Sequence, residues 1–219
     1  TDEDVVKIEK QIDVVEKLAV NTTELEHQCL YFAKGELARQ KEKDDKKAME
    51  MYMKAIHITL PDFDGKNPLR NNLLTFDEIM IINAIAILHA KADDIMTAVQ
   101  LGMWLKKYME EKIVDGTMKI AKYPMILYNL SNWLGRENCH KEALKMADLG
   151  IRFCIRYGNL AFFPILVFNK GGALAELGKI DQAKKYLHQS VTIFEAMDRP
   201  DLIQVATDWC KLHYRIDIQ

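Results

Sequence analysis

The side chains that could carry out chemistry are scattered along this sequence rather than grouped. Its six histidines and four cysteines form no CxxC pair and no zinc-site spacing, and His140 has no partner pair nearby. The acidic pairs Asp93-Asp94 and Glu110-Glu111 fall at expected turns or on expected exposed faces. No glycine-rich phosphate loop occurs. We therefore expect no enzymatic centre, no metal site and no cofactor.

Three asparagines are the strongest candidates for recognition, because Asn83, Asn129 and Asn169 occupy equivalent places in three successive segments. An amide side chain has both donor and acceptor groups. A ladder of amides can pair with the backbone of an extended peptide without requiring a particular peptide sequence. Asparagine at such positions can also bond a neighbouring helix. Burial of these amides between helices would count against peptide contact.

Other polar and aromatic residues lie close to these asparagines in the sequence. Asn132 is one helical turn beyond Tyr128, and Phe168 precedes Asn169. The two aromatic side chains could shape pockets for a peptide or belong to the ordinary core. Arg136, one turn beyond Asn132, could meet a peptide's C-terminal carboxylate or serve only at the surface.

Helices must position all of these residues, because apolar residues recur at helical spacing along almost the whole chain. Only five prolines and ten glycines interrupt the pattern. Pro124, Pro164 and Pro200 each precede a new apolar-periodic segment, where the fixed φ of proline suits the first helical turn. The sequence predicts an all-α chain with helix starts at these prolines.

Two successive proline-initiated segments align without a gap at a constant offset of 40 residues. In this alignment Ser131 matches Gly171 and Ala143 matches Ala183, and the expected turn residue Asn138 matches Gly178. Glycine inside a helix costs about 1 kcal/mol relative to alanine, so small residues there indicate a close helix crossing. Gly172 would relieve crowding beside the crossing. The pattern is typical of tetratricopeptide repeats and predicts a right-handed α-solenoid of antiparallel helix pairs.

We expect a single tetratricopeptide-repeat domain over 1–219 with terminal capping helices. Its expected parts are an N-terminal helix at 1–20, repeats at 24–58, 76–112, 122–156 and 162–197, and a capping helix at 200–216. The last helix reads as a cap or as the start of a degenerate fifth unit. The loop at 60–72 is either an idle insertion or part of a binding rim.

Composition narrows the class of partner. The chain has 30 Lys and Arg against 32 Asp and Glu, which gives no electrostatic reason for it to bind DNA or an anionic membrane. No apolar run is long enough to span a bilayer. Without a signal peptide, the widely spaced cysteines are expected as free thiols in the cytoplasm.

The long repeats, the added N-terminal helix and the ending SVTIFEAMDRPDLIQVATDWCKLHYR resemble the C-terminal half of the Rgg, Rap, NprR, PlcR and PrgX group of bacterial peptide receptors. The resemblance is greatest to the Rgg/MutR type. It implies a helical array that binds a short signalling peptide and forms a homodimer. It also implies a helix-turn-helix domain that binds DNA, and no such domain is present in this sequence. Concave-face asparagines hold the peptide backbone in several members, and Asn83, Asn129 and Asn169 match these positions.

Two functions remain open at this point. The first is the peptide-sensing and dimerising domain of a cytoplasmic transcriptional regulator used in quorum sensing. The alternative is a scaffold or adaptor array that binds a partner protein. For the homodimer, the expected contact includes Trp209, Leu212 and Tyr214 of the last helix.

Overall fold

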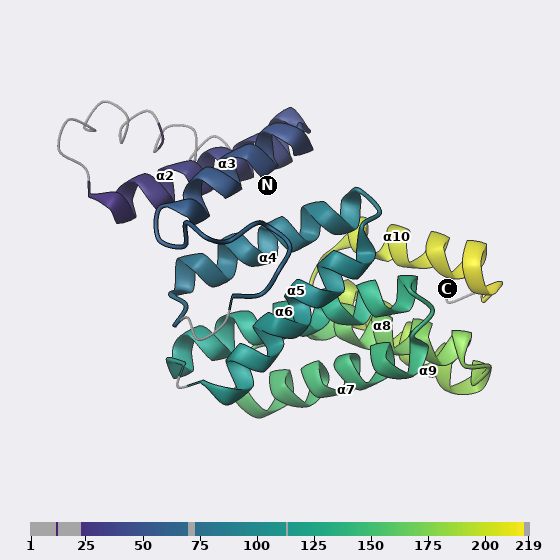
Figure 1. Ribbon diagram of the computed structural model, residues 1–219. Coiled ribbons are helices and arrows are strands. Elements are labelled where there is room, and N and C mark those ends of the chain that lie inside the picture. Colours follow the sequence, from purple (N-terminus) through teal and green to yellow (C-terminus); the bar gives the residue numbers. More distant parts are fainter. Residues whose placement is uncertain (1–11, 13–22, 70–72, 113, 217–219) are drawn as a thin grey trace. The chain divides into compact units, whose positions relative to one another are not determined.

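The protein is helical throughout the part of the chain that the structure describes, and no strand occurs there (Figure 1). The structure is a computed structural model, and it describes residues 12, 23–69, 73–112 and 114–216. The chain divides into two compact units, residues 1–101 and 102–219. Apart from Ile12, the expected N-terminal helix at 1–20 lies outside the described residues.

The first unit begins with an antiparallel helix pair. Its helical elements are α2 (Glu24–Leu37), the π-helical turn η2 (Ala38–Glu42), α3 (Asp45–His57), α4 (Phe76–Lys91) and the start of α5 (Ile95–Glu111). Polar side chains determine where these helices begin. Thr23 and Thr75 each form a reciprocal capping box with a glutamate three residues later, and Asp44 caps α3.

The second unit contains the rest of α5 and the two pairs that the sequence alignment identified. Its further elements are α6 (Gly116–Arg136), α7 (His140–Tyr157), α8 (Phe163–Glu176), α9 (Ile180–Ala196), α10 (Pro200–Trp209) and the π-helical turn η3 (Cys210–Tyr214). Each helix from α6 to α9 packs against the next one, and α6 also packs against α8. This is the neighbour pattern of stacked helix pairs.

The turns inside the helix pairs repeat one backbone geometry. Asp93, Asn138 and Gly178 occupy equivalent turn positions and have positive φ values of 65°, 58° and 73°. In the third and fourth pairs, the next residue donates its backbone N–H to the carbonyl five positions earlier, at 2.9 Å in both. Such a left-handed residue ends a helix without leaving its last carbonyls unpaired. The 40-residue offset is therefore visible in the turns.

The expectation that three prolines begin helices is right for two of them and wrong for Pro124. Pro164 and Pro200 lie in the first turns of α8 and α10. By contrast, α6 begins at Gly116, where the N-cap Asp115 accepts a backbone N–H at 3.0 Å, and Pro124 is buried inside the helix. The third helix pair therefore begins several residues before the expected boundary at 122.

A side chain compensates for proline in the interior of α6. Proline has no N–H, so Pro124 cannot bond the carbonyl of Ile120 four residues earlier. The side-chain amide of Asn159, in the turn between α7 and α8, donates to this carbonyl at 2.7 Å. This substitute donor explains how the helix continues through the proline.

Four small residues that were expected at helix crossings are buried: Ser131, Ala143, Gly171 and Ala183. Gly35 of α2 is buried as well. Contact distances show how close the crossing between α8 and α9 is. A Cβ atom at Gly171 would lie 2.7 Å from Leu187 Cγ and 3.1 Å from its backbone nitrogen. Real Cβ contacts this short essentially do not occur, so glycine is required by the packing at this position.

The described part of the long loop, residues 60–69, is anchored to the helices of the first unit. Phe63 is only 1% exposed. His57 Nε2 lies 2.8 Å from the carbonyl oxygen of Phe63, and His89 Nε2 lies 3.0 Å from that of Gly65. These contacts favour a structural role for this part of the loop.

Candidate functional site

The candidate site is the surface formed by α6 and α8, which we call the α6–α8 face. On α6, Tyr128, Asn132 and Arg136 follow one another at intervals of four residues and so share one side of the helix. Asn132 and Arg136 are exposed, whereas Tyr128 is half-buried. On α8, Asn169 is also half-buried. The face therefore combines accessible amide, phenol and guanidinium groups.

Asn169 joins α8 to α6 through its side-chain amide. The amide nitrogen donates to Ser131 Oγ at 2.7 Å and lies 3.3 Å from the backbone oxygen of Tyr128. The Ser131 hydroxyl donates to the same Tyr128 oxygen at 2.8 Å. These bonds fix the separation of the two helices, so Asn169 has a structural role whether or not a ligand is bound.

The other two asparagines of the expected ladder are buried. Asn83 is 3% exposed and Asn129 is 7% exposed, and both interact with other parts of the protein. Burial counts against direct contact between these two amides and a peptide. Asn83 belongs to the first unit, whereas Asn129 and Asn169 belong to the second unit together with the α6–α8 face.

Aromatic side chains form one wall of the α6–α8 face. The Tyr128 ring stacks on Phe162, with ring centroids 6.0 Å apart and an interplanar angle of 29°. Burial raises the pKa of Tyr128, so its hydroxyl is a neutral hydrogen-bonding group at neutral pH. Phe168 packs instead against a buried cluster that we call the C-terminal apolar cluster. Its members include Leu174, Leu187, Phe194, Cys210 and Ile216. Phe162 was not identified from the sequence, where it is one of two adjacent phenylalanines just before Pro164.

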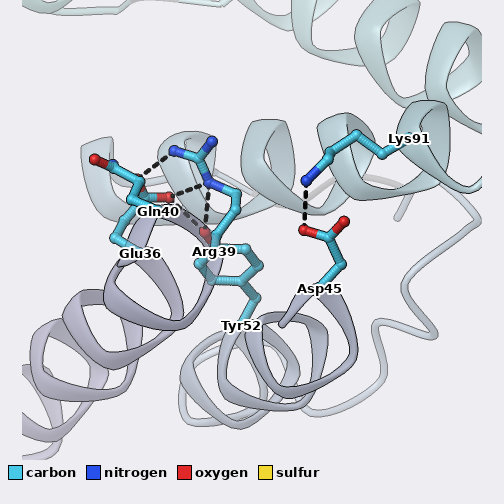
Figure 2. Close-up of polar contacts among 6 residues, drawn as sticks. All are labelled: Glu36, Arg39, Gln40, Asp45, Tyr52 and Lys91. Carbon is cyan, nitrogen blue, oxygen red and sulfur yellow. Dashed lines mark hydrogen bonds and ion pairs between the residues drawn. The ribbon is translucent and has the colours of Figure 1, made fainter. Parts of the chain in front are cut away.

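A dense polar network that was not predicted from the sequence lies in the first unit. Figure 2 shows its side chains. Glu36 accepts hydrogen bonds from Arg39 Nη2 at 2.6 Å, from Gln40 Nε2 at 2.7 Å and from the Tyr52 hydroxyl. Arg39 Nε lies 3.3 Å from both Glu36 and the Tyr52 oxygen. The spacing of Glu36, Arg39 and Gln40, three and four residues apart, is the signal that could have revealed part of this network.

The charges of this network stabilise one another. Burial by itself would raise the pKa of Glu36, but hydrogen bonds from Arg39 and Tyr52 outweigh it, so the pKa lies below its usual value. Burial and the neighbouring carboxylate both raise the pKa of Tyr52, so its hydroxyl stays a donor. Because these groups satisfy one another's hydrogen bonds, we interpret the network as a structural contact that fixes the end of α2 and η2 to α3.

Figure 2 also shows an ion pair between α3 and α4. Lys91 Nζ lies 2.6 Å from Asp45 Oδ1. The two side chains are 47% and 41% exposed, so water and salt screen their attraction. The contact therefore adds little to stability.

Neither a metal site nor a membrane-spanning helix is found among the residues that the structure describes. Within them, no group of three or more His, Cys, Asp or Glu side chains is arranged to hold a metal ion. No helix in this part of the chain is both long and apolar enough to cross a bilayer.

Comparison with known proteins agrees with the repeat architecture. A tetratricopeptide repeat model matches residues 166–196. The apo form of Bacillus thuringiensis PlcR is similar in structure, with a TM-score of 0.69 and 16% identity, over 94% of this chain and 78% of that one. PlcR in complex with the peptide PapR7 and DNA also gives a TM-score of 0.69 and 16% identity, over 93% of this chain and 74% of that one. A search of curated proteins finds no match. The expected α-solenoid of tetratricopeptide-like helix pairs is confirmed.

Proposed function

We propose that this chain is the ligand-sensing and dimerisation domain of a cytoplasmic bacterial transcriptional regulator of the Rgg, Rap, NprR, PlcR and PrgX group, of the Rgg/MutR type. The supporting observation is its similarity in fold to PlcR over 94% of the chain, because one PlcR structure contains both a peptide and DNA. We assign DNA binding to a helix-turn-helix domain outside these residues.

In this proposal a short, largely apolar peptide binds in an extended form on the α6–α8 face. Asn132 is exposed and offers both a donor and an acceptor to the peptide backbone. The stacked rings of Tyr128 and Phe162 supply apolar surface. Arg136, which is exposed at the end of α6, pairs with the C-terminal carboxylate of the peptide.

The three ladder asparagines receive a positioning role in this proposal. Asn83 and Asn129 are almost completely buried, and Asn169 already bonds α6 through its amide nitrogen. Asn129 and Asn169 hold α6 and α8, which carry the contact residues, and Asn83 has the corresponding role on α4 in the first unit. Phe168 acts in the same way, because it anchors α8 to the C-terminal apolar cluster.

We also propose that the domain forms a homodimer through its last helix. Val205, Trp209 and Leu212 lie on one side of the segment formed by α10 and η3, and they are 63%, 47% and 77% exposed. A stripe of large apolar residues in water is typical of a protein interface. Tyr214, the other expected contact, is half-buried against α8 and is left out of this interface. Light scattering at micromolar concentration should show a dimer that Leu212→Asp converts to a monomer.

Peptide titration tests the proposed function. Calorimetry with a panel of short apolar peptides that includes PapR7 should find a ligand for the wild-type domain. Each hydrogen bond of the amide contributes about 0.5–1.5 kcal/mol, so Asn132→Ala, which removes both its donor and its acceptor, should weaken binding by roughly tenfold. Gln189→Ala is the matched control, because Gln189 is an exposed amide residue on α9 in the same unit.

Peptides with a modified C-terminus test the role of Arg136. Wild type should bind a peptide with a free C-terminal carboxylate more tightly than the same peptide with a C-terminal amide, whereas Arg136→Ala should bind both peptides equally. Equal affinity of wild type and Asn132→Ala for the ligand found would remove the α6–α8 face from the mechanism. A complete lack of binding across the panel would favour the adaptor alternative.

A further inference from the structure

Gly172 on α8 has a close neighbour from the C-terminal end of the chain. A Cβ atom at this glycine would lie 2.9 Å from the hydroxyl oxygen of Tyr214 and 3.7 Å from its Cζ atom. The phenol therefore rests directly on the backbone of α8. Gly172 therefore leaves the space that the Tyr214 phenol occupies, whereas Gly171 allows the close crossing with α9.

The segment that carries Tyr214 is fixed on both sides of this residue. Cys210 and Ile216 are 0% and 2% exposed and belong to the C-terminal apolar cluster. Arg215 adopts a left-handed φ of 53°, which turns the chain so that the N–H of Ile216 donates to the carbonyl of Cys210 at 3.1 Å. Tyr214 is thus held by buried neighbours and is not a freely moving chain end.

Tyr214 covers α8 next to the candidate site. Asn169, Gly172 and Glu176 follow one another at intervals of three and four residues, so they share the side of α8 that carries the amide of Asn169. Burial raises the pKa of Tyr214, and the Glu176 carboxylate, one turn beyond Gly172, acts in the same direction. The phenol therefore occupies the side of α8 between Asn169 and Glu176.

We propose that Tyr214 is the end wall of the ligand-binding face and sets the length of peptide that the domain accepts. This inference rests on the proposed function. A ligand that follows α8 from Asn169 toward Glu176 meets the phenol at Gly172. Glu176 lies about one helical turn beyond Gly172, which is about 5.4 Å. An extended peptide advances about 3.3 Å per residue, so removal of the wall makes room for about two more residues.

Variants of Tyr214 and Gly172 distinguish an effect on the end wall from an effect on folding. Tyr214→Ala removes the ring. Gly172→Ala keeps the ring but displaces the hydroxyl, because the new Cβ atom would otherwise lie 2.9 Å from it. Tyr214→Phe is the matched control, since it retains most of the ring while leaving room at Gly172. Thermal unfolding monitored by circular dichroism checks that each variant is folded, and Tyr214→Leu, which also removes the ring, is used if Tyr214→Ala does not fold.

The experiment is affinity selection from a mixture of random-sequence peptides of graded length, with mass spectrometry of the retained peptides. Wild type, Tyr214→Phe and Gly172→Ala should retain short peptides, because all three keep the ring, whereas Tyr214→Ala should retain peptides about two residues longer. The same length distribution for wild type and a folded variant without the ring would overturn the end wall and leave the proposed function intact. If wild type and every variant retain no peptide, the proposed function fails, and the end wall fails with it.

Discussion

In the first helix pair a glycine of α2 meets an aromatic ring of α3, whereas in the fourth pair a glycine of α8 meets an aliphatic side chain of α9. Gly35 packs against Tyr52, and Gly171 packs against Leu187. Both crossings need a residue without a side chain. They differ in what the partner requires, because a buried phenol must bond its hydroxyl and a leucine has no polar group.

This difference explains where the polar side chains of each pair lie. The Tyr52 hydroxyl is satisfied by Glu36, which is in turn bonded to Arg39 and Gln40 (Figure 2). The fourth pair is held mainly by an apolar cluster that includes Leu187. We therefore expect the first pair to be sensitive to changes of charge and pH and the fourth pair to changes of volume.

The largest expected effect tests the crossing in the fourth pair. Gly171→Leu should lower the free energy of unfolding by about 3 kcal/mol, because the backbone nitrogen of Leu187 cannot move away as a side chain could. Urea unfolding followed by circular dichroism measures this change. Gly135→Leu is the control, since a Cβ atom there meets nothing within 4 Å. Equal stability of the two variants would show that the assigned helix crossing is incorrect.

The next effect concerns the network in the first pair. Glu36→Ala should cost about 2 kcal/mol, because Arg39 and Tyr52 lose their acceptor in a partly buried place. Glu50→Ala, which removes an exposed partner of Lys54, should cost only a few tenths of a kcal/mol. Comparable losses for the two variants would mean that the network contributes no more than a surface ion pair.

A third prediction concerns pH. Because the folded pKa of Glu36 lies below its usual value of 4.5, its contribution to stability is present above that value and is lost as the pH falls through the folded pKa. The stability difference between wild type and Glu36→Gln, about 1 kcal/mol at neutral pH, should therefore shrink below pH 4.5. Urea titrations at a series of pH values measure it. A difference that does not change across this range would contradict the assigned role of the carboxylate charge.

The smallest effect is expected for the ion pair between α3 and α4. Lys91→Ala should change the free energy of unfolding by less than about 0.5 kcal/mol, because both partners are nearly half exposed. A double-mutant cycle with Asp45→Ala measures the interaction itself. A coupling well above this size would show that the first unit depends on its surface charges as well as on the Glu36 network.

Much of the fold could be predicted from the sequence because helix periodicity and turn chemistry are local. The four helix pairs, the equivalent turns at Asn138 and Gly178 and the buried crossing residue Gly171 all follow from spacing along the chain. Periodicity could not place the start of α6. The hydrogen-bond donor that replaces the missing N–H of Pro124 comes from Asn159, in the turn between α7 and α8.

The candidate site was predicted less completely. Spacing placed Tyr128, Asn132 and Arg136 on one side of a helix, and the structure agrees. Spacing alone could not distinguish an asparagine that faces water from one that is buried, as Asn129 is. The Glu36 network was missed because Tyr52, its key donor, comes from a different helix.

By itself, then, the sequence determined that the chain is helical, where its helix pairs turn and which positions must be small, since these depend on residues within a few turns of one another. Tertiary structure alone decided what each small residue meets. The Tyr52 ring, the Leu187 backbone and the Tyr214 hydroxyl reach Gly35, Gly171 and Gly172 from other elements. A contact of this kind depends on how helices pack, and helical periodicity specifies the face of a helix but not the side chain that will cover it.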